Sequence, residues 1–260
     1  MQSSNPVLGK AFNQPNNSSN QDSFQQLEQS YQSPAASSMR TGRMTIEDVV
    51  AKTGFLFGIL VVVGAVAWSA NLGMGAAMIG FLGAFGLAMA ISFSKSVKPG
   101  LVIAYAVLEG LALGTISHAF EATYQGIVGQ AVLGTLSAFA GVLFMYRSGR
   151  LRATPQFTRA VMGAAIGYFI LGLISLIGSF FGLGNGNGIY GFAGAGALFA
   201  VAGVALASFF LVLDFDQIEK GVRAGVPEQE SWRAGFGLMV TIVWLYLEIL
   251  RLLSILRNDR

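Results

Sequence analysis

Seven long apolar stretches, separated by short polar segments, limit what this chain can fold into more than any other feature. A helix rises 1.5 Å per residue, so about 20 apolar residues are needed to cross roughly 30 Å of hydrocarbon. We therefore expect an all-α integral membrane protein with seven spanning helices. Six is the alternative count, because the glycine-rich sixth stretch or the charged seventh could be re-entrant. The spans are predicted at residues 54–72, 76–94, 99–119, 126–146, 160–183, 189–213 and 236–256.

Composition supports a membrane protein and excludes several classes of site. Of 260 residues, 53% are hydrophobic and 11% are charged, whereas an ordinary soluble domain has roughly 25% charged residues. The chain has no Cys, which excludes disulfides, thiolate chemistry and Cys-based zinc sites. Its one His, His118, cannot form a His-rich metal site alone. The net charge of +3 gives no support for a nucleic-acid partner.

The polar N-terminal region differs from the rest of the chain. Residues 1–46 are rich in Gln, Asn and Ser and lack the apolar side chains that a core needs, so we predict a disordered tail. The favoured interpretation is a passive solvated extension, and the alternative is a partner-binding arm. Residues 47–260 form the predicted transmembrane domain. At the boundary, Thr45 can cap a helix with Asp48 three positions later, leading directly into the first span.

The positive charges alternate between successive loops and predict the orientation of the chain. The loops around Asn71, around Glu121 and at 184–188 contain no Lys or Arg. Because basic loops stay in the cytoplasm, the N-terminus is predicted to be cytoplasmic, in a multi-pass protein of the cell membrane. With seven spans Arg257 and Arg260 fall on the outer side, against this rule. The basic residues of the other loops are Arg40, Arg43, Lys52, Lys95, Lys98, Arg147, Arg150, Arg152, Arg159, Lys220, Arg223 and Arg233.

Four acidic residues in or near the apolar stretches are the candidate site: Glu109, Asp214, Asp216 and Glu248. An ionised carboxylate at the centre of a membrane costs about 2.5–3.5 kcal/mol on insertion scales, and such acids are functional by default. Simpler interpretations remain open. Glu248 can pair with Arg251 one turn later, Asp214 and Asp216 can be solvated acids at a helix end, and Glu109 can be protonated and hydrogen-bonded between helices.

The functional interpretation joins these acids. Two carboxylates close together in a low-dielectric site tend to share one proton, so their charge changes with pH. Carboxylate oxygens are also suitable ligands for Ca²⁺, which makes a pH-dependent cation path the economical mechanism. No enzyme signature or cofactor motif occurs in the sequence, so we expect neither an enzyme nor a bound cofactor. An intramembrane aspartyl protease is disfavoured because its flanking motifs are missing.

Three segments resemble motifs of the Bax inhibitor-1 family: Phe209 to Ile218, Tyr246 to Leu253, and the Glu109-Gly110 pair. Their order and spacing extend the resemblance over roughly residues 50–256. It implies a seven-helix bundle with the last helix near the centre. Bacterial members are described as pH-sensitive calcium leak channels, with a proton-sharing acidic pair from the last two helices.

Carried over by motif, this acidic pair would be Asp214 and Glu248, which are also the residues that would contact Ca²⁺. Two departures concern the pair. Glu248 stands where the family pattern has Asp, and the first two spans lack the arginine associated with the pair, leaving Lys95 or Lys98 as replacements. We expect the two carboxylates to come within hydrogen-bonding or single-water reach.

The sequence thus predicts a pH-sensitive calcium leak channel whose partners are the lipid bilayer, Ca²⁺ and H⁺. The alternative is an interaction protein that modulates a membrane protease or another assembly, in which the tail and loops would matter more than the acids. A proton-coupled transporter ranks third, because the sequence shows no convincing inverted repeat.

Overall fold

The computed structural model describes residues 42–186, 188–192 and 194–258, and seven helices in this part of the chain are long and apolar enough to span a membrane. The prediction of seven spanning helices is therefore confirmed. The described chain also contains two short 3₁₀ turns, η1 (Leu183–Gly186) and η2 (Gly188–Gly191), between α8 and α9. The helices are α4 (Ile46–Ser69), α5 (Met74–Phe93), α6 (Pro99–Thr123), α7 (Ile127–Arg147), α8 (Pro155–Phe180), α9 (Ala195–Ala224) and α10 (Glu230–Asn258).

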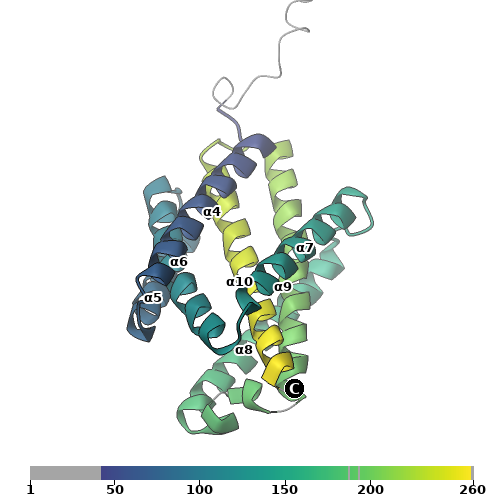
Figure 1. Ribbon diagram of the computed structural model, residues 1–260. Coiled ribbons are helices and arrows are strands. Elements are labelled where there is room, and N and C mark those ends of the chain that lie inside the picture. The colour runs from purple at the N-terminus through teal and green to yellow at the C-terminus, as the bar shows by residue number, and fades with distance from the viewer. Residues whose placement is uncertain (1–41, 187, 193, 259–260) are drawn as a thin grey trace, which may run out of the picture. The chain divides into compact units, whose positions relative to one another are not determined.

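The last helix, α10, is at the centre of the bundle, as expected. It packs against α4, α6, α7 and α9, and Figure 1 shows it between α4 and α6 on one side and α7 and α9 on the other. Its inward residues include Met239, Leu245 and Leu250, whose side chains are fully buried. By contrast, α5 and α8 expose most of their apolar side chains. In a membrane protein such a surface faces lipid, which is as apolar as the side chains themselves.

Glycines let α4, α5 and α6 approach closely. A Cβ atom built at Gly114 on α6 would lie 2.2 Å from the carbonyl oxygen of Gly64 on α4. One built at Gly80 on α5 would lie 2.8 Å from the carbonyl oxygen of Leu108 on α6. These contacts are too short for any side chain, so both glycines lie at helix interfaces where the backbones approach closely.

Not every glycine within a helix lies at an interface. At Gly163 and Gly167 on α8, an added Cβ atom would have no neighbouring heavy atom within 4 Å. Both glycines lie on the sparsely packed perimeter helix, where glycine is not needed for a close approach.

Several helix ends differ from the predicted boundaries. Thr45 forms the predicted capping box with Asp48, and the helix that it starts leads directly into the first span, as predicted; α4 therefore begins eight residues before the predicted apolar span. The glycine-rich segment before Ala195 forms 3₁₀ turns, which moves the start of α9 six residues later. At its other end α9 continues to Ala224 and stops at Gly225, which has a left-handed φ of 65°.

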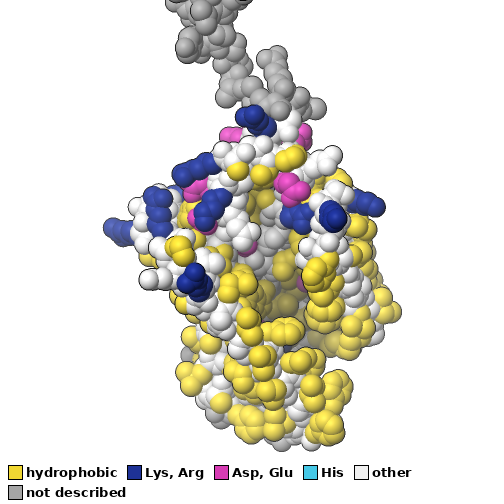
Figure 2. Space-filling view, turned by 180° about the vertical axis from the view of Figure 1, so that it is seen from behind, with side chains coloured by type: hydrophobic (Ala, Val, Ile, Leu, Met, Phe, Trp, Pro, Cys, Tyr) yellow, Lys and Arg dark blue, Asp and Glu magenta, His cyan; other side chains and the backbone are white. Residues whose placement is uncertain are grey.

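Charged side chains gather at one end of the bundle. We call it the basic end: α4, α6, α8 and α10 begin there, and α5, α7 and α9 end there. Figure 2 shows Lys, Arg, Asp and Glu concentrated toward this end and hydrophobic side chains over the rest of the face. At the opposite end, Arg257 donates hydrogen bonds to the Gln125 carbonyl (2.7 Å) and to Gln130 Oε1 (2.9 Å). This arginine therefore caps the α6–α7 loop.

The predicted N-terminal tail falls mostly on residues 1–41, which lie outside the described residues. Residues 42–46, which the prediction places at the end of the tail, instead make backbone contacts with the α9–α10 loop or begin α4.

Candidate functional site

Asp214 lies at the inner end of a cavity between α9 and α10 that begins at the basic end. The cavity has a volume of about 240 Å³. Its walls are the residues Asp214, Gln217, Ile218 and Gly221 on α9 and Glu230, Arg233, Ala234 and Gly237 on α10, which follow the i, i+3, i+4, i+7 pattern of one face of each helix. Met44 and Val226 complete the lining.

The Asp214 carboxylate is held among few polar groups. It lies beside the hydroxyl of Thr241 on α10. Its Oδ2 atom is buried and has no hydrogen-bond partner among the residues that the structure describes. The nearest charged lining residues are Glu230 and Arg233, which pair with each other at 2.8 Å. Asp214 is therefore a partly buried acid without a direct counterion in the described chain.

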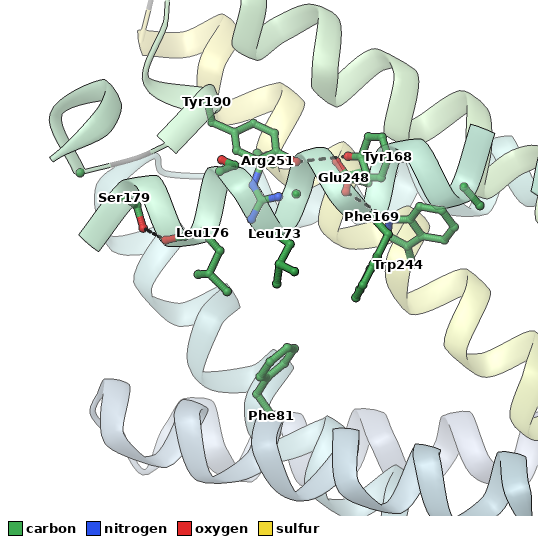
Figure 3. A pocket seen from close by; sticks show the side chains of 14 residues that line it. Phe81, Tyr168, Phe169, Leu173, Leu176, Ser179, Tyr190, Trp244, Glu248 and Arg251 are labelled. Carbon is green, nitrogen blue, oxygen red and sulfur yellow. Dashed lines mark hydrogen bonds between the residues drawn. The ribbon is translucent and has the colours of Figure 1, made fainter. Parts of the chain in front are cut away.

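Glu248 lines a second, larger cavity of about 660 Å³ nearer the opposite end of the bundle. The floor of the cavity comes from α10, one wall from α8, and Phe81 of α5 lies across from them (Figure 3). Glu248 is 4% exposed, and its Oε1 accepts a hydrogen bond from Nε1 of Trp244 at 3.1 Å. Arg251, one turn further along, does not approach Glu248 within ion-pair distance in the described residues. Its guanidinium group instead stacks on the Tyr190 ring, 4.1 Å from the centroid.

Two tyrosines complete the polar cluster around Glu248. The hydroxyls of Tyr168 and Tyr190 are 3.1 Å apart and share a hydrogen bond (Figure 3). Burial raises the pKa of Tyr190, so this phenol stays protonated and keeps a hydrogen for the bond. Both Tyr168 and Glu248 lie against the bare Cα of Gly203 on α9. A Cβ there would be 2.4 Å from the Tyr168 hydroxyl and 2.7 Å from Glu248 Oε2.

The structure does not bring Asp214 and Glu248 together, so the expected proton-sharing pair is absent. Asp214 lies opposite Thr241, whereas Glu248 lies opposite Gly203. On α9, Gly203 and Asp214 are eleven residues apart, which corresponds to roughly 16 Å. The predicted pair assumed that span seven starts near residue 236. Because α10 starts at Glu230, six residues earlier, Glu248 lies about 9 Å further from the start of its helix than the predicted boundary implies.

An apolar layer separates the two acids. Ala207 and Leu211 on α9 and Leu245 on α10 are fully buried and belong to one hydrophobic cluster. Each lies between the level of Asp214 and the level of Glu248 along its own helix. The two cavities are therefore separate, and the α9–α10 contact between them has no polar lining at these positions.

Glu109 and Asp216 have different surroundings from the two cavity acids. Glu109 on α6 is 8% exposed and lies beside the hydroxyl of Tyr105 one turn earlier. The Tyr105 ring packs edge-on against Phe236 of α10, with centroids 4.9 Å apart. Asp216 forms an ion pair with Lys220 at 2.6 Å near the basic end. Asp216 is therefore an acid near the end of the bundle, in line with the simpler interpretation, and it lines neither cavity.

No group of three or more His, Cys, Asp or Glu side chains in the described chain is close enough to hold a metal ion. Asp214 and Glu248 cannot contribute to one Ca²⁺ site, because the apolar layer lies between them. Each acid can at most supply one carboxylate to a passing cation, with water as the remaining ligand.

Several residues of the Glu248 cluster were not predicted from sequence: Tyr168, Tyr190, Gly203 and Trp244. The available signal was Trp244 four residues before Glu248, because residues at this spacing share a helix face.

Comparison with known proteins assigns the chain to a family. No curated protein matches the chain. A family model described as Bax inhibitor 1 like matches residues 5–258, nearly the whole sequence. This match agrees with the order of the acidic motifs, with the seven helices and with the central position of α10. The chain is a multi-pass membrane protein that belongs to the Bax inhibitor 1 like family.

Proposed function

We propose that this protein is a pH-sensitive leak path for Ca²⁺, in which Asp214 and Glu248 are two successive cation-attracting positions. The observation that carries the proposal is the placement of these acids. Each is nearly buried, each has one carboxylate oxygen without a hydrogen-bond partner among the described residues, and each lines a cavity near a different end of the bundle. Family membership supports the same function.

The conformation described here is closed. An ion in the cavity beside Asp214 is separated from Glu248 by the packed side chains of Ala207, Leu211 and Leu245. Dehydrating a cation in such an apolar layer is costly, so conduction requires α9 and α10 to move apart there. The arrangement fits a slow leak better than a permanently open pore.

The sign of the pH dependence follows from the charge of the acids. An ionised carboxylate attracts Ca²⁺, whereas a protonated one does not, so flux increases as pH rises through the range in which the acids ionise. The charged groups near Asp214 are Glu230 and Arg233. Near Glu248 the charged group is Arg251.

Calcium flux into proteoliposomes, measured across pH with a fluorescent indicator, tests this proposal. We expect Asp214→Asn and Glu248→Gln each to lower the flux about tenfold at high pH, the equivalent of about 1.4 kcal/mol, and to flatten its pH dependence. Asp216→Asn is the matched control, because Asp216 is already paired with Lys220 outside both cavities. Its flux should equal that of the unmodified protein. Unchanged flux in both cavity variants would reject the proposal.

In the alternative function, modulation of a membrane protease or another assembly, the tail and the loops would matter more than the acids. Deleting residues 1–41 leaves the contacts of residues 42–46 with the bundle in place and separates the two functions: loss of a co-purifying partner with intact calcium flux would favour the alternative.

A further inference from the structure

A short N-terminal segment, residues 42–44, lies across the end of the cavity that contains Asp214; we call it the strap. The Met44 N–H donates a hydrogen bond to the carbonyl oxygen of Val226 at 2.8 Å. The Glu228 N–H donates to the carbonyl oxygen of Gly42 at 3.0 Å. The strap is therefore hydrogen-bonded to the α9–α10 loop on both sides of its central residue.

Between these two hydrogen bonds, Arg43 and Pro227 face each other as an antiparallel bridge. A residue pair in this position exchanges no backbone hydrogen bonds with each other. Proline has no N–H to donate, so Pro227 fits this position without losing a bond. The α9–α10 loop thus has a sequence suited to receive the strap.

The side chain of Met44 fills the end of the cavity. Met44 is 4% exposed and lines the cavity together with Asp214. Its terminal methyl group lies against Gly221 on α9, where a Cβ atom would be only 2.7 Å away. Gly221 is two turns from Asp214 on the same face of α9, roughly 10 Å nearer the basic end. Glycine at this position therefore makes the notch that admits Met44.

Both ends of the contact are fixed to the bundle. After Met44, the capping box of Thr45 and Asp48 starts α4, with the Asp48 N–H donating to Thr45 Oγ1 at 3.2 Å. On the loop side, Lys52 of α4 forms an ion pair with Glu228 at 3.0 Å and donates to Ser231 Oγ at 2.6 Å. These contacts hold the strap and the loop against each other.

We propose that the strap is a stopper for the cavity: Met44 blocks access to Asp214 from the basic end, and withdrawal of residues 42–44 opens it. The effect of the strap on calcium flux rests on the proposed function, whereas its effect on access to the cavity does not. Access can therefore be measured separately.

The first experiment measures access with a thiol probe. The chain has no Cys, and Gly237 lines the cavity at a position where an added Cβ meets nothing within 4 Å. The full-length Gly237→Cys protein in nanodiscs is reacted with a membrane-impermeant methanethiosulfonate reagent. Adding Met44→Ala should raise the labelling rate at least about tenfold. Adding Val50→Ala, at a nearby site on α4 that is 65% exposed, should leave it unchanged.

The second experiment locks the strap. Cα atoms of a non-hydrogen-bonded antiparallel pair are about 4.5 Å apart, within the range that a disulfide spans. In the Arg43→Cys/Pro227→Cys/Gly237→Cys protein, oxidation should join the first two thiols and slow labelling at position 237. Reduction should restore it, as read by mass spectrometry of the peptide that contains this position.

The outcomes separate the two proposals. Equal labelling rates with and without the Met44 side chain, or with the strap locked and unlocked, overturn the stopper. Faster labelling in the Met44→Ala protein without any change in its calcium flux upholds the stopper and counts against the leak path.

Discussion

Gly203 is the residue on which the geometry around Glu248 depends most directly. With Ala at this position, the new methyl group would lie 2.4 Å from the Tyr168 hydroxyl and 2.6 Å from the carboxylate carbon of Glu248. Both contacts are close to 1 Å shorter than an ordinary van der Waals contact. Tyr168 is held by its hydrogen bond to Tyr190 and Glu248 by its bond from Trp244, so neither can retreat without losing a partner.

The expected free-energy change is the balance of two effects. Overpacking a well-packed site costs about 1–3 kcal/mol, and replacing Gly by Ala within a helix recovers up to about 1 kcal/mol. Gly203→Ala should therefore lower the free energy of unfolding by about 1–2 kcal/mol. Adding Tyr168→Phe removes the shortest contact, so the double variant should be less destabilised than the sum of the two single variants.

Equilibrium unfolding in mixed micelles, followed by tryptophan fluorescence, measures these differences. Gly167→Ala is the matched control, because this glycine is also within a helix but has nothing within 4 Å of the added methyl position. It should be neutral or slightly stabilising. If Gly203→Ala were as stable as Gly167→Ala, the placement of Glu248 and Tyr168 against α9 would be wrong.

Two further predictions concern the helix packing and the separation of the acids. Gly114→Ala should destabilise the protein by about 1–3 kcal/mol, because the backbone of Gly64 lies 2.2 Å from the new methyl position. Gly58→Ala, which has open space around the new methyl group, should not destabilise it. Equilibrium unfolding curves compare the two variants. In proteoliposome flux, the effects of Asp214→Asn and Glu248→Gln should add within about 0.3–0.5 kcal/mol, because sites more than 7–10 Å apart act independently. Strongly non-additive effects on flux in the double variant would instead support a shared-proton pair.

The number and type of the helices could be predicted because each crossing requires a long apolar stretch that has no other stable solution. The ends of the helices could not, because polar residues continue a helix beyond the hydrocarbon as readily as they end it. Residues 214–224 illustrate this: their charges suggested the end of the sixth span, yet they form the last turns of α9. At the start of α9 the error was the reverse: the glycine-rich segment before Ala195 is apolar enough to be predicted as part of the span, but it forms 3₁₀ turns.

The identity of the candidate acids could be predicted, but their mutual arrangement could not. A carboxylate in an apolar stretch is visible in the sequence, whereas its depth depends on where its helix begins, at 1.5 Å for each residue. An error of six residues at the start of α10 shifts the depth of Glu248 by about 9 Å, which is more than a hydrogen bond can span. The side chain opposite each acid, Thr241 for one and Gly203 for the other, belongs to another helix and leaves no local signal.

The separation of the acids changes what a pH-sensitive path requires of this fold. A shared proton would act as one switch at one depth. Two acids on either side of an apolar layer instead need a movement that connects their cavities, and α9 and α10 are the helices that carry both acids and the layer. The loop between these helices is the one to which residues 42–44 and Lys52 are bound. Any separation of α9 from α10 that starts at the basic end should therefore disturb the contact between Met44 and Gly221, which would link the position of the strap to the closed state of the proposed path.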